Sequence, residues 1–356
     1  MNTVSRRAIL KSIGVIGLGA AHFALPDAVD RALAHAAAYQ GELPLAPHWN
    51  GEPLGRITGE YMNARSQPTV DADVANVLDQ HSVVRVRRVV PGQTVFLHNN
   101  LWLETEYGYL YSSFVQPMYY HLPNHPTADL GAGRWGEVTV PFTEAYWQPI
   151  PTPQYWVDRL FYSSILRIFE LVRGEDGRSW YHVQELYQDY YVPATHVRII
   201  MPEDLAPLSP QLAPSAKRIE VDLQSQVLTA YERDTPVLRH RVATGLPDWG
   251  TPPGTHYVVD KRPSERMVGG RAATEEDEEG YNLGGIPFVC YFTWEWVATH
   301  GTYWHNDYGQ PHSHGCVNVP PHIARWLWRW TTPIADYDEM VVRVDNALDG
   351  TRVIVF

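Results

Sequence analysis

Only one stretch of this 356-residue chain is convincingly helical, and that scarcity limits the possible folds more than any other feature. Residues 322–331 follow two prolines, which suit the first turn of a helix. Ile323, Leu327 and Trp330 share one face at the i, i+4, i+7 spacing. Elsewhere, short β-branched and aromatic runs alternate with turn residues. The sequence therefore predicts a mainly β protein with one helix packed on many strands.

Residues 217–356 are predicted to form one C-terminal domain, because they hold the helix and a series of strand-like segments. Alternating residues at 218–223 and 227–232 flank a short turn, which favours a β-hairpin. A Pro-Pro-Gly sequence at 252–254 supplies another turn. The strands predicted in this domain are 218–223, 227–232, 237–244, 255–260 and 340–344.

The chain before this domain is expected to contain small β modules. Residues 37–80 show little periodicity, which predicts an irregular lead-in. Within 81–204, a strand, a turn, an aromatic strand and an aromatic exit ending in proline occur at most twice, in weak form. This pattern resembles the small SH3-like barrels of bacterial wall-associated proteins. Residues 205–216 are rich in proline, which indicates a stiff linker and the main domain boundary.

The N-terminus has the order of elements found in a secretory signal. Arg6 and Arg7 precede an apolar run at 12–25, and small residues follow as far as Ala36. The paired arginines resemble a twin-arginine signal. We therefore expect residues 1–36 to be a signal peptide and the protein to be exported to the periplasm or cell wall. The alternative is an amphipathic N-terminal helix. No membrane span is expected in the mature form, since no later stretch reaches about 18 apolar residues.

Net charge limits the class of partner. The chain carries 28 Lys and Arg against 40 Asp and Glu, a formal charge of −12 at pH 7. This balance argues against nucleic acid, because phosphate binding needs a basic surface. The acidic run at 275–279 is expected to be a solvated loop, and the alternative is a lid that meets cationic groups of a substrate.

One of only two cysteines lies in a glycine-bearing turn, the sequence Ser-His-Gly-Cys-Val-Asn at 313–318. Gly315 allows a positive φ or a close backbone approach beside Cys316. N–H groups in such a turn can converge on an oxyanion. A thiolate at Cys316 needs a base or an electropositive setting, and His300 and His314 are the candidate bases.

Other interpretations of these residues are open. His300, His305, His312, His314 and Cys316 could supply ligands for zinc, although they lack the paired spacing of zinc sites. For His305 and His312 the simpler interpretation is that they are ordinary polar loop residues.

The second cysteine, Cys290, lies in an apolar strand-like run and is predicted to be a small buried hydrophobe. A disulfide between Cys290 and Cys316 would block the proposed nucleophile.

Three motifs follow one another in a characteristic order. They are a Thr-Pro-Pro-Gly-Thr-His-Tyr turn at 251–257, a His-Gly-Thr strand end at 300–302 and the cysteine motif at 313–318. Residues 217–345 thereby resemble the catalytic domain of YkuD-type L,D-transpeptidases, which implies a β-sandwich with one capping helix. There are two departures. Twelve residues separate His300 from Ser313, slightly few for the family, and Asn318 stands where many members carry arginine.

The resemblance also implies roles for individual residues. Cys316 would be the acyl-accepting nucleophile, and His300 would accept and return its proton. The carbonyl of Gly301 or of a neighbouring residue would orient His300, and backbone N–H groups around His314, Gly315 and Cys316 would form the oxyanion hole. The residues expected to support, shape or line the site are His314, Ser313, Thr302, Tyr303, Trp304 and Asn318.

The implied function is peptidoglycan cross-linking. The cysteine would form a thioester with the diamino acid of a tetrapeptide stem and release the terminal D-Ala, and an amine on a neighbouring stem would complete the cross-link. With water as acceptor the protein would be a carboxypeptidase, and a non-catalytic wall-binding protein is a further alternative. No metal or cofactor is implied, a monomer is expected, and the family's cysteine predicts acylation by carbapenems.

Overall fold

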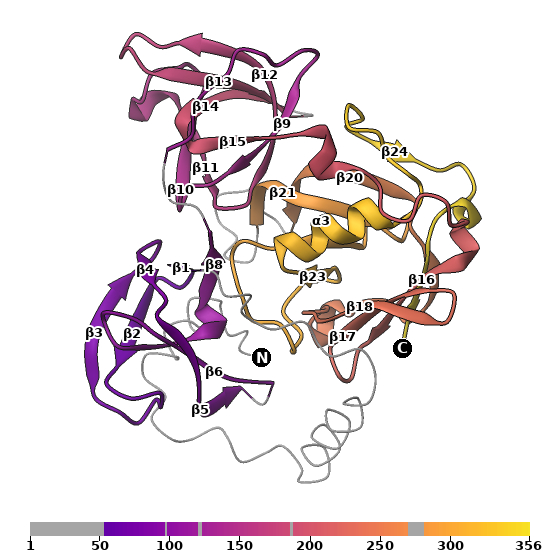
Figure 1. Ribbon diagram of the computed structural model, residues 1–356, viewed down its shortest axis with the longest axis horizontal. Coiled ribbons are helices and arrows are strands. Elements are labelled where there is room, and N and C mark those ends of the chain that lie inside the picture. The colour runs from indigo at the N-terminus through magenta and orange to yellow at the C-terminus, as the bar shows by residue number, and fades with distance from the viewer. Residues whose placement is uncertain (1–52, 97, 120–122, 186–187, 270–280) are drawn as a thin grey trace.

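The computed structural model describes residues 53–96, 98–119, 123–185, 188–269 and 281–356. The predicted signal peptide at 1–36 and the acidic run at 275–279 lie outside the described residues. The described residues form five β-sheets and one α-helix, α3 (Pro321–Trp330). Figure 1 shows how these elements are arranged. The prediction of a mainly β protein with one helix is confirmed for this part of the chain. None of its helices has the length and apolar character needed to cross a membrane.

Residues 54–118 form the N-terminal module, which contains a three-stranded and a five-stranded sheet. The irregular lead-in predicted for 37–80 is wrong between residues 54 and 79, where three strands lie. The third of them is exposed along most of its length, so its sequence has no apolar alternation to detect. In sheet order the strands are β4 (Val83–Arg85), β1 (Leu54–Ile57) and β8 (Val115–Met118), then β3 (Val74–Asp79), β2 (Tyr61–Arg65), β7 (Tyr109–Tyr111), β6 (Asn99–Glu104) and β5 (Arg88–Phe96).

Residues 134–200 form the central module, a single seven-stranded sheet. The region predicted over 81–204 is therefore divided between two modules, and the first of them begins at residue 54 rather than 81. An SH3-like topology for either module stays a prediction. In sheet order the strands are β11 (Trp156–Phe161), β10 (Phe142–Tyr146), β14 (Asp189–Pro193), β13 (Ser179–Gln184), β12 (Ile165–Arg173), β9 (Arg134–Val138) and β15 (Val197–Ile200).

The C-terminal domain consists of two five-stranded sheets and α3. The predicted hairpin forms between β16 and β17, but the last strand, β25, was not predicted and pairs in parallel with β16. The first sheet has the order β18 (Thr235–Arg241), β17 (Val227–Glu232), β16 (Lys217–Asp222), β25 (Arg352–Val355) and β19 (Gly254–Tyr257). The second has the order β23 (Val317–Val319), β22 (Ala298–Gly301), β21 (Tyr281–Tyr291), β20 (Asp260–Gly269) and β24 (Val342–Arg343).

The main hydrophobic core lies among these two sheets and α3. Ile323, Leu327 and Trp330 of α3 are buried in it, as their spacing predicts. Figure 1 shows α3 lying across β21. Trp135 of the central module belongs to the same core, so the central module and the C-terminal domain share one apolar interior.

The proline-rich stretch at 205–216 connects the central module to the C-terminal domain, and it is held against α3. Leu205 is buried in the shared core. The N–H of Leu208 donates to the carbonyl oxygen of Arg329 at 2.9 Å, and Arg329 Nε donates to the carbonyl oxygen of Ala206 at 2.7 Å. These bonds attach the stretch to the helix, so it does not act as a free spacer.

Arg56 of β1 reaches from the N-terminal module into the C-terminal domain. It is 2% exposed, and its Nη2 donates to the carbonyl oxygen of Tyr303. Its Nε donates to Gln116 Oε1 at 2.8 Å, and its Nη1 lies 3.0 Å from His81 Nδ1. The guanidinium also lies 5.1 Å from the ring centroid of Phe161 in the central module. Burial lowers the pKa of Arg56 to about 9. One side chain thus joins all three parts of the chain.

Replacing Arg56 by methionine keeps an apolar stem but removes these donors. The carbonyl of Tyr303 and Oε1 of Gln116 then lose hydrogen bonds in a buried setting, at about 1–3 kcal/mol for each unsatisfied group. We expect Arg56→Met to lower the free energy of unfolding by about 2 kcal/mol or more. Urea denaturation measures this change.

Arg88→Met is the matched control, because the Arg88 side chain is 68% exposed and pairs with Glu104 at the surface. Its effect should stay below about 1 kcal/mol. Equal losses in the two variants would contradict the importance of the buried contacts of Arg56.

Candidate active site

Two short parallel strands bring the predicted histidine and cysteine motifs together. In the pairing of β22 with β23, Thr299 lies opposite Val317 and His300 lies opposite Asn318. Cys316 immediately precedes β23 and packs with Ala298 in a small apolar cluster. Val317 instead packs into the main core. Because side chains alternate along a strand, Cys316 and His300 belong to the face that points away from the main core.

The turn before β23 is held by hydrogen bonds to its own backbone. Gly315 has the predicted positive φ, 118°. Ser313 Oγ accepts from the N–H of Gly315 at 3.1 Å and donates to the carbonyl oxygen of Cys316 at 2.5 Å. Thr251 Oγ1, from the predicted turn at 251–257, donates to the carbonyl oxygen of Gly315 at 2.7 Å. Thr251 was not predicted as a site residue, although its motif was noted.

These bonds occupy one of the N–H groups that were predicted to form the oxyanion hole. The N–H of Gly315 is engaged by Ser313 Oγ, so it supports the turn and is not open to a ligand. The backbone N–H of Cys316 takes part in none of the bonds described above. Gly315 and Ser313 therefore shape the turn, and the Cys316 N–H is the better candidate for contact with an oxyanion.

The thiol of Cys316 is partly buried, and its Sγ lies 3.9 Å from the carbonyl oxygen of Trp296. Burial raises the pKa of Cys316 to about 11, although a backbone hydrogen bond from Ala298 acts in the opposite direction. The residue is therefore a thiol at neutral pH, and its reaction as a nucleophile requires a base. Cys290 is buried, and both cysteines are free, so the disulfide considered above is not formed.

His300 is 3% exposed, and its Nδ1 lies 3.0 Å from the carbonyl oxygen of Gly301. Nδ1 donates in this bond, so the neutral ring keeps its proton there and leaves Nε2 as the acceptor. Burial lowers the pKa of His300 to about 4, and the Gly301 carbonyl opposes this effect only in part. The imidazole is therefore neutral at pH 7 and can take up a proton at Nε2.

Aromatic rings flank the candidate histidines. The ring centroid of Trp304 lies 5.9 Å from that of His300. His314 lies 5.3 Å from Trp249 and 5.5 Å from Tyr281, measured between ring centroids. Trp249 and Tyr281 were not predicted as site residues. The available signal was a tryptophan two residues before the motif at 251–257, and Trp249 is 55% exposed.

Three residues predicted to line the substrate site lie in the interior instead. Tyr303 is 1% exposed, and its hydroxyl donates to a backbone carbonyl oxygen of β21 at 2.7 Å. Thr302 Oγ1 lies 2.6 Å from the hydroxyl oxygen of Tyr308, and Asn318 Nδ2 lies 3.0 Å from His305 Nε2. Each side chain is already bonded within the protein, which argues against direct substrate contact. Of the residues predicted to line the substrate site, Trp304 is only partly buried and remains a candidate for substrate contact.

His305 is not the ordinary loop residue that was predicted. It is 5% exposed, and its ring stacks on His312 with centroids 4.3 Å apart. Within the described ranges, no group of three or more His, Cys, Asp or Glu side chains is placed to hold a metal ion. The zinc interpretation therefore has no ligand set in that part of the chain.

Residues 216–355 match the family model described as YkuD, L,D-transpeptidase catalytic domain. The C-terminal domain therefore belongs to this family, as the three sequence motifs predicted. No curated protein matches the chain.

Among solved structures, the chain is similar to a cysteine-to-serine mutant of Enterococcus faecium L,D-transpeptidase. They share 24% identity over 40% of this chain and 50% of that one, with a TM-score of 0.31. It is also similar to an L,D-transpeptidase from Mycobacterium smegmatis, at 16% identity over 77% and 99% of the two chains and a TM-score of 0.33. The chain spans about half the length of the E. faecium protein.

The high pKa of the Cys316 thiol predicts how its alkylation depends on pH. Iodoacetamide reacts with the thiolate, whose fraction grows about tenfold per pH unit below the pKa. Since the pKa of Cys316 is raised to about 11, we expect its alkylation rate to rise through the whole range from about pH 7 to 9.5. Mass spectrometry of samples quenched at successive times measures the alkylation rate. Cys290→Ala is the control and should leave the profile unchanged. A plateau near pH 7 would contradict the thiol state.

Proposed function

We propose that this protein is an exported peptidoglycan L,D-transpeptidase that acts through a thioester on Cys316. The observation that carries the proposal is the pairing of β22 with β23, which brings the turn bearing Cys316 beside the strand bearing His300. His300 is tied to the Gly301 carbonyl through Nδ1, which leaves Nε2 to act as the base. The membership of residues 216–355 in the YkuD family supports the same activity.

In the proposed first step, Cys316 Sγ attacks the carbonyl carbon of the diamino acid in a tetrapeptide stem. The thiol proton moves to His300 Nε2 as the carbon–sulfur bond forms, because both groups are neutral before the reaction. The N–H of Cys316 donates to the developing oxyanion. The bond to the terminal D-Ala then breaks, and the departing amine takes the proton from the His300 imidazolium.

The second step transfers the acyl group. An amine of a neighbouring stem gives its proton to His300 Nε2 and attacks the thioester, and the thiol of Cys316 is restored with that proton. Water in place of the amine gives the carboxypeptidase outcome. The partly exposed rings of Trp304 and His314 are the proposed walls of the substrate site. Export through the twin-arginine-like segment at 1–36 would bring the protein to this substrate.

Intact-protein mass spectrometry with a carbapenem tests the nucleophile. We expect one covalent adduct on the wild-type protein and none on Cys316→Ala, while Cys290→Ala keeps the adduct. His300→Gln should slow acylation by about 10²–10⁴-fold, because the general base is lost. Absence of an adduct on folded, reduced protein would leave the proposal without its nucleophile.

Assays with synthetic tetrapeptide stems then distinguish transpeptidase activity from carboxypeptidase activity. Release of D-Ala with formation of a cross-linked dimer is the expected result. Release of D-Ala with only the shortened stem as product would assign a carboxypeptidase. No release of D-Ala by a protein that still takes up the carbapenem would contradict the tetrapeptide as substrate.

A further inference from the structure

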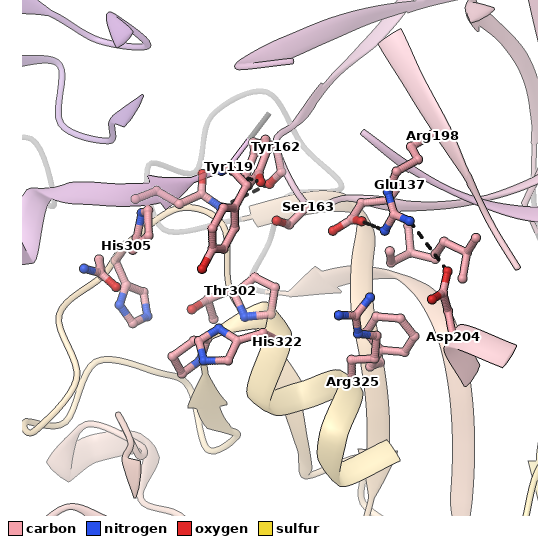
Figure 2. A pocket seen from close by; sticks show the side chains of 18 of the residues that line it. Tyr119, Glu137, Tyr162, Ser163, Arg198, Asp204, Thr302, His305, His322 and Arg325 are labelled. Atoms are coloured by element: carbon pink, nitrogen blue, oxygen red, sulfur yellow. Dashed lines mark hydrogen bonds and ion pairs between the residues drawn. The ribbon is translucent and has the colours of Figure 1, made fainter. Parts of the chain in front are cut away.

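A cavity of about 520 Å³ lies where the three parts of the chain meet, and we call it the junction cavity. It is lined by Gln116 of β8 and by Tyr119, which follows β8. Glu137 and Arg198 of the central module and His322 and Arg325 of α3 also line it, among others. Figure 2 labels Tyr119, Glu137, Arg198, His322 and Arg325 and shows their side chains converging from separate elements. The volume falls in the range of small-ligand sites, about 300–1,000 Å³.

The junction cavity is distinct from the site around the nucleophile. Cys316, His300 and His314 are not among the residues that line it. Thr302 lines it and follows His300 by two residues, so the cavity adjoins the histidine segment without including the candidate base. The reaction proposed above therefore does not account for it.

At one end of the cavity, an arginine forms ion pairs with two carboxylates. Arg198 lies between two carboxylates, with its Nη2 2.5 Å from Glu137 Oε2 and its Nη1 3.6 Å from Asp204 Oδ2. The dashed lines in Figure 2 mark both pairs. Because two carboxylates surround one guanidinium, their oxygens can also accept hydrogen bonds from N–H or O–H groups of a ligand.

Arg325 supplies the opposite charge from another wall. Ile323 and Leu327 turn to the core, so His322 and Arg325 project from the outer face of α3 into the cavity. Among the described residues no carboxylate lies within ion-pair distance of Arg325.

We propose that the junction cavity binds a ligand that carries a carboxylate, with Arg325 as its ion-pair partner. A guanidinium offers a planar fork of donors that matches a carboxylate, and such charge-assisted bonds are stronger than neutral ones. The carboxylate oxygens of Glu137 and Asp204 accept hydrogen bonds from N–H or O–H groups at the other end of the ligand. An acidic amino sugar and an acidic peptide fragment share this chemistry, and their relevance to a wall polymer rests on the proposed function.

Ligand-observed saturation-transfer NMR tests the proposal with three probes. N-acetylmuramic acid and N-acetyl-D-glutamate carry the carboxylate on a sugar and on an amino acid, whereas N-acetylglucosamine shares the sugar ring and lacks a carboxylate. We expect at least one acid to bind the wild-type protein, and the neutral sugar to bind about tenfold more weakly or less. The acid that binds identifies the sugar or the peptide source.

Arg325→Gln should weaken binding of the acid by about tenfold or more. Arg352→Gln removes the same charge from an exposed position of β25 and should leave binding unchanged. Carbapenem acylation of Cys316 should be the same in both variants, which shows that they are folded and separates this test from that of the proposed function. Equal binding of the neutral sugar, no binding of either acid, or full binding by Arg325→Gln would each overturn the proposal.

Discussion

The parallel pairing of β22 with β23 is the constraint on which the candidate site depends. It sets the register of His300 against the strand that follows Cys316, and α3 begins directly after β23. Gly301 makes the close packing around this pair feasible, because a Cβ there would lie 2.6 Å from Pro287 Cγ and 2.9 Å from Pro321 Cα. The residue whose carbonyl orients His300 thus also leaves room for the start of the helix.

Burial acts on Cys316 and His300 in opposite directions that both favour the neutral form. It raises the pKa of Cys316 to about 11 and lowers that of His300 to about 4, so each is held in its neutral form at pH 7. A thiolate–imidazolium pair would be poorly solvated in such a setting. In the mechanism proposed above, the proton therefore moves while Cys316 attacks the substrate, when an oxyanion forms beside the turn.

The two N-terminal modules are joined to the C-terminal domain by buried polar contacts in addition to the connecting chain. Arg266 of β20 is held by Asp158 at 2.8 Å and Glu185 at 2.6 Å, both from the central module. Trp135 Nε1 donates to the carbonyl oxygen of Tyr337 at 2.7 Å. Together with the contacts of Arg56, these bonds attach both modules to the C-terminal domain.

Local sequence was sufficient for features that depend on neighbouring residues. The helix expected at 322–331 lies at Pro321–Trp330, Gly315 has its positive φ, and the motif order predicted the family found at 216–355. Tertiary structure alone decided the pairing of β25 with β16, the inward orientation of Tyr303 and the pKa shifts of Cys316 and His300. A sequence pattern reports spacing along the chain, whereas burial and strand pairing depend on which distant segments pack together.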